Sequence, residues 1–293
     1  NLVNYDPDQD RVFIMYQDKN DSHYVKHTIG LWNPGVWGFD GTTVTNDYRD
    51  NDGYGTYSWT TPVESFGADT GFPDTYSTTD MCYDSDNQKW VLVYTDNYSA
   101  TSLYVRTGTL VGGTTNTLTW SSAVSWTDTG NTNPFWMSTC YDTKQKQVVV
   151  FYRDGNDSDY GKLKTITIAA NGTPTWGTYT YTWKSSAVTD LGAAYFAKQN
   201  RPMVGHRNSN YQQFDSMSYN TGTSTYTHQH NLNTYNSAYH SRPKYSTFHK
   251  KLATVYYQSS SYPKIRTLDM NSTGTLSTTG DHNLLENETS TSD

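Results

Sequence analysis

Five copies of one pattern, with no helix-forming segment between them, predict an all-β fold: a five-bladed β-propeller of four-stranded antiparallel blades. Each copy opens with a tyrosine, followed by Asp in the first three copies, and continues through a polar turn into an apolar run. The opening tyrosines are Tyr5, Tyr83, Tyr141, Tyr195 and Tyr245. β-Branched residues, Asn and Gly interrupt every candidate helix. The last three spacings suit a blade, and the first contains an insert of about 20 residues.

Each copy contains four segments that read as short strands. The first carries the tyrosine, and the second is a continuous apolar run such as Val148–Tyr152, which is typical of a strand buried on both faces. The third alternates, as in Lys162–Ile166. A turn such as Asn171-Gly172 then leads to a Thr-rich fourth strand that includes Thr175-Trp176.

These segments predict one domain over residues 1–285, followed by a polar tail over residues 286–293. The predicted blades span residues 1–66, 78–128, 136–186, 190–236 and 240–285.

Composition excludes two classes of partner. The formal charge is −7, with 21 basic and 28 acidic side chains and no basic cluster, which argues against nucleic acid. No long apolar span predicts a membrane helix, so we expect no membrane insertion. Apolar residues make up only 34% of the chain, but 15% of residues are aromatic, and large rings can close a core. The two cysteines, Cys82 and Cys140, occupy the same place in neighbouring repeats, and we expect free buried thiols there rather than a disulfide.

The repeated motif resembles that of predicted phage tail-fibre and virion appendage proteins, and of secreted β-propellers. The motif is Tyr-Asp, a polar turn, and an apolar run that closes in Tyr-x-Asp. The fourth copy departs from it, with His206 and Asn208 in place of Tyr and Asp, and the fifth has Gln258 in place of Asp. The resemblance implies a propeller fold and a virion or extracellular location, and it carries over no catalytic residue.

The insert of the first copy is the strongest candidate ligand site in the sequence. Long loops in compact domains are often functional, and aromatic faces beside carboxylates are typical of carbohydrate sites. The predicted glycan-binding residues are Trp32, Trp37, Phe39, Asp40, Tyr48, Asp50, Asp52 and Tyr54. The alternative is that these rings pack the loop onto the blades or onto a neighbouring subunit.

A second aromatic and polar patch combines residues 206–211 with residues 226–230. It can equally be a solvated loop and an edge strand. Metal sites have weaker support: Asp154-x-Asn156-x-Ser158 and Asp6-x-Asp8-x-Asp10 begin like calcium loops but lack the later Gly and Glu. A zinc site formed by His228, His230 and His240 lacks a Cys or carboxylate partner in phase. The sequence predicts no metal and no cofactor.

Enzyme activity is not predicted, because glycosidase chemistry needs paired carboxylates and Glu occurs only at positions 64, 286 and 288. The recurrent Asp18, Asp96 and Asp154 follow the blade repeat, which indicates a structural role. The predicted function is a non-enzymatic structural or adhesion module of a virion or extracellular appendage. Its predicted partners are glycans or a host receptor, and other copies or appendage subunits. The alternatives are a purely structural filament subunit, and a propeller glycoside hydrolase or lyase that uses Asp residues around the central channel.

Overall fold

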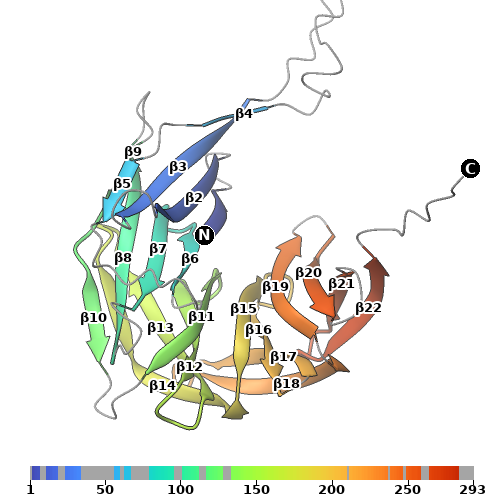
Figure 1. Ribbon diagram of the computed structural model, residues 1–293. Helices are drawn as coiled ribbons and strands as arrows, with labels where there is room; N and C mark the ends of the chain where they lie inside the picture. Colours follow the sequence, from blue (N-terminus) through green and yellow to red (C-terminus); the bar gives the residue numbers. More distant parts are fainter. Residues whose placement is uncertain are drawn as a thin grey trace, which may run out of the picture. The chain divides into compact units, whose positions relative to one another are not determined.

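The computed structural model describes residues 2–6, 11–18, 24–33, 56–59, 63–66, 79–95, 101–111, 117–127, 133–209, 211–236, 238–246, 249–258 and 264–283. Every regular element in this part of the chain is a β-strand, which confirms the all-β prediction (Figure 1). Accordingly, the described part holds no helix long and apolar enough to cross a membrane. The chain divides into two compact units, residues 1–70 with 109–120, and residues 71–108 with 121–293.

The first unit contains one antiparallel sheet in the order β1-β2-β3-β4, with β5 also paired to β3. Its strands are β1 (Leu2–Asp6), β2 (Arg11–Asp18), β3 (Tyr24–Asn33), β4 (Thr56–Trp59) and β5 (Val63–Phe66). The buried side chains include Phe13, Met15 and Ile29, and the ring of buried His27 stacks on Phe13 with 5.4 Å between centroids. β9 (Thr117–Trp120) also belongs to this unit.

The second unit contains four antiparallel sheets, each built from strands that follow one another in the chain. One sheet contains β6 (Thr79–Asp84), β7 (Lys89–Tyr94), β8 (Ser102–Val111) and β10 (Val124–Thr127). The next contains β11 (Pro134–Asp142), β12 (Gln147–Asp154), β13 (Tyr160–Ile168) and β14 (Pro174–Ala187). The third contains β15 (Thr189–Phe196), β16 (Arg201–Asn208), β17 (Tyr211–Asn220) and β18 (Thr225–Asn236). The last contains β19 (Ala238–Ser246), β20 (Lys251–Gln258), β21 (Lys264–Met270) and β22 (Leu276–Asn283).

The five sheets fit the five predicted blades, and the fold class is a five-bladed β-propeller. Two blades differ from the expected four strands because their outermost strand is divided. β4 and β5 both pair with β3, and β9 and β10 both pair with β8. Pro62, which has no N–H to donate to a strand ladder, lies between β4 and β5 in the sequence. The predicted single domain and its polar tail stay predictions, and the tail lies outside the described residues.

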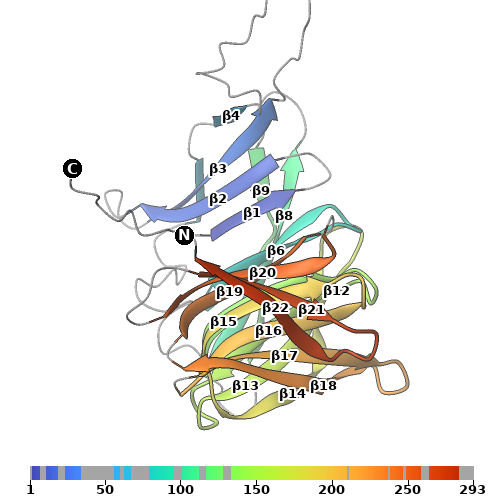
Figure 2. The same cartoon turned by 90° about the vertical axis from the view of Figure 1, so that its right-hand side faces the viewer.

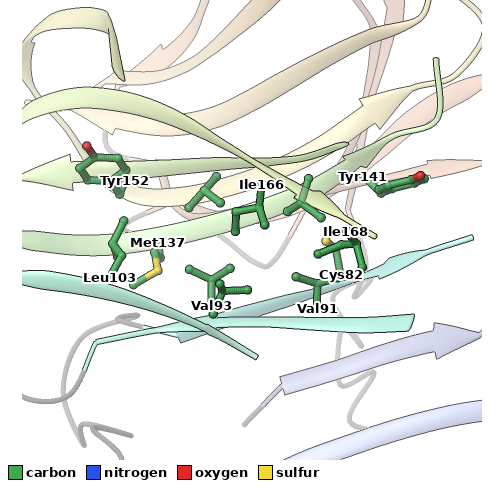
Figure 3. Packing of buried hydrophobic residues seen from close by; sticks show 12 residues of the cluster. Cys82, Val91, Val93, Leu103, Met137, Tyr141, Tyr152, Ile166 and Ile168 are labelled. Atoms are coloured by element: carbon green, nitrogen blue, oxygen red, sulfur yellow. The ribbon is translucent and has the colours of Figure 1, made fainter. Parts of the chain in front are cut away.

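Within the second unit, the first strand of each blade lies beside the first strand of the next. β11 lies between β6 and β15, and β15 lies beside β19 (Figures 1 and 2). Neighbouring sheets pack face to face around apolar cores (Figure 3). In the core between the β6 and β11 sheets, Val91 and Val93 meet Val148 and Val150. The strands β7 and β12 are buried on both faces, which explains why their sequences are continuous apolar runs.

The Tyr-Asp signature has a structural role at the turn between the first and second strands. Asp84 accepts hydrogen bonds from the backbone N–H groups two and three residues later, and Asp142 does the same. The tyrosine contacts the turn of the preceding blade: the hydroxyl of Tyr141 donates to Asp86 at 2.7 Å, and that of Tyr195 accepts from the backbone N–H of Lys144 at 3.3 Å. The repeat therefore joins neighbouring blades.

Both cysteines are buried free thiols, as predicted. Burial raises the pKa of the Cys82 and Cys140 thiols above the ordinary value, so neither is activated as a nucleophile.

Candidate functional site

Most of the predicted glycan site in the first insert lies outside the described residues. The backbone of Trp32 lies in β3, where it pairs with Tyr57 of β4. The other seven predicted residues, Trp37, Phe39, Asp40, Tyr48, Asp50, Asp52 and Tyr54, lie outside the described residues. The insert therefore stays a prediction.

A different site emerges where the blades are compared strand by strand. In each blade an aromatic residue lies near the end of the second strand, and a polar residue of the third strand lies diagonally across from it, opposite the residue two positions earlier. We name these two residues the repeat pair. The repeat pairs are Tyr16 with Thr28, Tyr94 with Arg106, Tyr152 with Lys164, His206 with Asp215, and Tyr256 with Arg266. Three blades place a cation at this position, and the β15–β18 blade places a carboxylate there.

The cationic repeat pairs are closed structural contacts. Arg106 donates to the Tyr94 hydroxyl at 3.0 Å, and buried Arg266 donates to the Tyr256 hydroxyl at 3.0 Å. The ammonium of buried Lys164 lies 4.1 Å from the ring centroid of Trp126 in the preceding blade. A buried cation beside a hydroxyl or an aromatic face is a stabilising arrangement that needs no ligand.

In the β15–β18 blade, Asp215 of β17 is instead the acceptor at the centre of a polar cluster. Its side chain is 0% exposed. One oxygen lies 2.5 Å from Nε2 of His228, and the other lies 2.5 Å from Nε2 of His206 and 3.0 Å from the amide nitrogen of Asn231. The ammonium of Lys184, from β14 of the preceding blade, lies 3.9 Å from the same oxygen.

The cluster holds an ionised carboxylate. Burial alone would raise the pKa of Asp215, but the hydrogen bonds from His206 and His228 outweigh it and hold that pKa well below its usual range. Burial lowers the pKa of His206, so this ring is neutral at neutral pH. Because an ionised carboxylate only accepts hydrogen bonds, both histidines donate from Nε2, and a ring that carries a single proton then has its lone pair on Nδ1.

A β-bulge in β18 brings His228 into the cluster. Asp215 pairs with Asn231 and Met217 pairs with His228, so Gln229 is the extra residue on β18. Directly paired residues share a face of the sheet. Without the extra residue His228 would point to the opposite face, and Asp215 would lose one of its donors.

A second bulge, in β14, supplies the other side of the cluster. Lys162 pairs with Thr182 and Gly161 pairs with Lys184, so Trp183 is the extra residue. The indole of Trp183 lies edge-on to His206, with 5.0 Å between ring centroids. It packs over Gly161, where an added Cβ would lie 2.5 Å from the indole. Only glycine at position 161 therefore leaves room for the ring that covers His206.

The cluster opens to solvent at His228, whose side chain is 33% exposed. No described residue hydrogen-bonds Nδ1 of His228, so a free ring nitrogen is available next to solvent. The hydroxyl of Tyr181 accepts from the backbone N–H of His228 at 2.9 Å. Tyr179, which is 51% exposed, stacks with Tyr181 at 6.5 Å between centroids. The opening therefore combines an imidazole with two aromatic side chains.

This cluster unites parts of the second patch predicted from sequence, with one correction. His206 and His228 converge on Asp215, but His206 is buried rather than part of a surface loop. The sequence analysis missed Asp215, Lys184 and Tyr181. The replacement of Tyr by His at position 206 was the one visible signal, because it breaks the repeat.

The metal candidates have other roles. His228 bonds Asp215, whereas Nδ1 of His230 accepts from the backbone N–H of Leu276 at 3.3 Å, so the two rings do not converge. The side chain of His240 lies outside the described residues. Asp154 accepts from the backbone N–H groups of Asn133 and Asn156, as in a turn. Across the residues whose side chains are described, no group of three metal-binding side chains occurs.

One alternative function was a glycoside hydrolase or lyase that uses Asp residues around the central channel. Two aspartates within described first strands are candidates for this role, Asp80 of β6 and Asp190 of β15. One oxygen of Asp80 accepts from the Ser138 hydroxyl at 2.9 Å and from the Thr139 N–H at 2.6 Å. These bonds join β6 to β11. Asp190 is buried in a left-handed backbone conformation, with φ of 55°.

Comparison with known proteins supports the fold. No family model matches the chain, and no curated protein matches it. Among solved structures, the chain is similar to the periplasmic gluconolactonase of Pseudomonas aeruginosa, with a TM-score of 0.51, 10% identity, and coverage of 96% of this chain and 84% of the gluconolactonase. It is also similar to the exo-β-1,3-galactanase of Phanerochaete chrysosporium, with a TM-score of 0.48, 9% identity and coverage of 93% of this chain. This chain spans 56% of the galactanase.

A third match is the propeller of Dos1, with a TM-score of 0.44 and 7% identity, covering 99% of this chain and 63% of the Dos1 chain. At 10% identity the gluconolactonase match indicates the fold alone. The sequence-based prediction of a non-enzymatic protein is contradicted, since the gluconolactonase is an enzyme on this same fold. The resemblance to phage tail fibres and the virion location stay predictions.

Proposed function

We propose that this protein is a carbohydrate-active enzyme whose acid–base residue is His228. One observation carries the proposal: a buried carboxylate, Asp215, fixes Nε2–H of a partly exposed histidine and leaves Nδ1 free. A carboxylate–imidazole pair of this kind selects the tautomer and orientation of the base. Among the five described repeat pairs, His206 with Asp215 is the one whose third-strand residue is a carboxylate and not a cation or Thr.

The pair performs two tasks in proton transfer. Before the reaction, Asp215 holds His228 in the tautomer whose Nδ1 lone pair can accept a proton. After the transfer, the buried negative charge stabilises the imidazolium that forms. Lys184, at 3.9 Å, offsets part of that charge and keeps the carboxylate ionised in its buried position. His206 and Asn231 hold the other carboxylate oxygen in place.

A glycan is the substrate class that suits the surroundings of His228. The Tyr181 hydroxyl contacts the backbone N–H of His228, and Tyr179 stacks with Tyr181. Aromatic faces stack on the apolar faces of sugar rings. The sugar-related names of the gluconolactonase and the galactanase agree with this substrate class. A glycan partner also retains part of the sequence-based prediction. An extracellular or virion location remains part of the proposal.

The test is a cleavage screen against a panel of neutral and acidic polysaccharides, with new reducing ends as the readout. Wild-type protein is expected to cleave at least one polymer, and His228→Gln is expected to lose that activity. His230→Gln is the matched control, because His230 lies two residues away on the same strand and does not contact Asp215. Cleavage that persists in His228→Gln would place the chemistry elsewhere, and no cleavage of any polymer would overturn the proposal.

A further inference from the structure

Resting on the proposed function, we infer that the substrate is a uronate-containing polysaccharide and that His228 cleaves it by β-elimination. Three features of the cluster, as the described residues form it, carry this inference. Its single carboxylate is inaccessible, its base is an imidazole, and an ammonium from which no described residue accepts a hydrogen bond lies beside it. Each feature disfavours hydrolysis or favours elimination.

The carboxylate cannot serve a hydrolase. Glycoside hydrolysis by the common route uses two carboxyl groups that flank the scissile bond, one of which donates a proton to the leaving oxygen. Asp215 is 0% exposed and already accepts three hydrogen bonds from His206, His228 and Asn231. Among the described residues of the cluster it is the sole carboxylate. A sugar at the opening would therefore meet an imidazole and not a carboxyl pair.

The ammonium of Lys184 is available to a ligand. Its distance of 3.9 Å from Asp215 is an ion pair and is too long for a hydrogen bond. No described residue accepts a hydrogen bond from Lys184, and its side chain is 20% exposed. Three N–H donors beside a general base fit an anionic group on the substrate. A sugar carboxylate is that group, since its neutralisation makes the adjacent C–H more acidic.

The reaction then balances without a co-reactant. Nδ1 of His228 removes the proton from the carbon next to the uronate carboxylate, with Lys184 on that carboxylate. The C–H electron pair becomes a C=C double bond as the bond from the neighbouring carbon to the glycosidic oxygen breaks. The departing oxygen keeps that bond's electron pair and takes the proton from the imidazolium, which restores neutral His228. The products are a new reducing end and an unsaturated uronate.

The aromatic pair positions the sugar for this step. Tyr181 is fixed by the hydrogen bond from the backbone of His228, so its ring has a defined place relative to the base. Tyr179 continues the same surface outward and is 51% exposed. Stacking on these rings would hold one sugar while the next presents its carboxylate to Lys184.

The experiment follows one reaction with two readouts, on polygalacturonate, alginate and the same polymers after reduction of their carboxyl groups to alcohols. Elimination gives reducing ends together with ultraviolet absorbance from the conjugated double bond, whereas hydrolysis gives reducing ends alone. Wild-type protein is expected to produce both signals on a polyuronate and neither on its reduced form. His228→Gln is expected to abolish both signals.

Lys184→Met distinguishes binding of the carboxylate from general damage. We expect KM for the polyuronate to rise at least about tenfold, an effect typical of a lost charged contact, with the thermal midpoint close to that of the wild type. Lys198→Met, at an exposed lysine in the turn after β15, is the matched control and is expected to leave KM unchanged. An unchanged KM in Lys184→Met would overturn the role of Lys184.

The outcomes separate the two proposals. Reducing ends without ultraviolet absorbance, or His228-dependent cleavage of neutral glycans alone, would overturn the uronate inference and leave the proposed function standing. A protein that cleaves no polymer would overturn both.

Discussion

The β15–β18 and β19–β22 blades place opposite charges at the same backbone position, and the contrast separates structure from function. In the β19–β22 blade, Arg266 is buried, donates to Tyr256 and Gln212, and lies over the Tyr256 ring with 4.6 Å from its Cζ to the centroid. In the β15–β18 blade, Asp215 gathers two histidines, one of which reaches solvent. The cationic pair uses its polar groups to join strands and blades. The anionic pair leaves a ring nitrogen free for chemistry.

The contrast also shows how a repeat protein can acquire a site. The backbone ladder is the same in both blades, with Val204 opposite Asp215 and Thr254 opposite Arg266. The bulges are shared as well: Thr279 is the extra residue on β22, as Gln229 is on β18, and Thr234 on β18 corresponds to Trp183 on β14. What differs is the side chains at these positions. A change of side chains at the repeat pair, together with His228 where β22 has Thr278, converts a structural contact into an acid–base cluster on the same bulged backbone.

The largest expected effect comes from Asp215→Asn, which keeps the shape and removes the charge. An amide can no longer select the His228 tautomer or stabilise its imidazolium, so kcat should fall roughly a thousandfold or more, with KM nearly unchanged. Steady-state kinetics on the substrate found in the screen checks this split. Asp159→Asn, in the turn between β12 and β13, should keep kcat within about twofold of wild type. A larger fall in KM than in kcat would contradict the role assigned to Asp215.

His27 of the first unit should make the folding stability of the protein sensitive to acid. Burial lowers the pKa of His27 from 6.5 to about 4, so the unfolded chain binds a proton at higher pH than the folded one. Stability is therefore full above about pH 6.5 and falls as the pH drops toward 4, by roughly 3 kcal/mol. His27→Phe should remove this part of the pH dependence, as measured by chemical denaturation at several pH values. Unaltered pH dependence in the variant would refute the assignment.

The same logic applies to His206, whose pKa is also lowered by burial. A variant without this histidine should lose part of the acid sensitivity below pH 6.5 as well. Asp215 affects stability at lower pH. Because its pKa is depressed in the folded state, its ionised carboxylate stabilises the fold above the ordinary carboxyl pKa, and this contribution is lost as the pH falls further.

The cationic repeat pair should affect stability alone. Arg266→Met leaves the hydroxyl of Tyr256 and the amide oxygen of Gln212 without one donor, which should cost about 2 kcal/mol of unfolding free energy. Activity per folded molecule should stay at the wild-type level. Denaturant titration measures the loss of stability, and kinetics on the same preparation measure the activity. A loss of kcat per folded molecule would contradict the purely structural role assigned to Arg266.

The smallest expected effect concerns the aromatic face. Tyr179→Ala should raise KM about tenfold with kcat nearly unchanged, because the exposed ring would stack on the sugar and takes no part in proton transfer. Tyr211→Ala removes a ring of similar exposure, 48%, at the start of β17, and serves as the control. Equal effects of the two variants would remove the argument for a sugar platform at Tyr179.

Much of the fold could be predicted from the sequence, because the repeat motif carries its own structural chemistry. The tyrosines and Asp84 and Asp142 mark the turns, and the apolar runs mark the buried second strands. The divided outer strands could not be predicted, since β4, β5, β9 and β10 are only four residues long each and share no pattern that marks where one ends and the next begins. The cluster was hidden for a related reason: Asp215 lies in a third strand, outside the motif. The bulges at Gln229 and Trp183 change which face a side chain occupies, and a period-two reading cannot detect them.

The most direct test of the site is the tautomer of His228, read from its ring nitrogens by NMR at neutral pH. The contacts around Asp215 predict a proton on Nε2 and a bare Nδ1, with that preference lost in Asp215→Asn. A His228 ring protonated on Nδ1 in the wild-type protein would contradict the account, because no lone pair would then face the solvent.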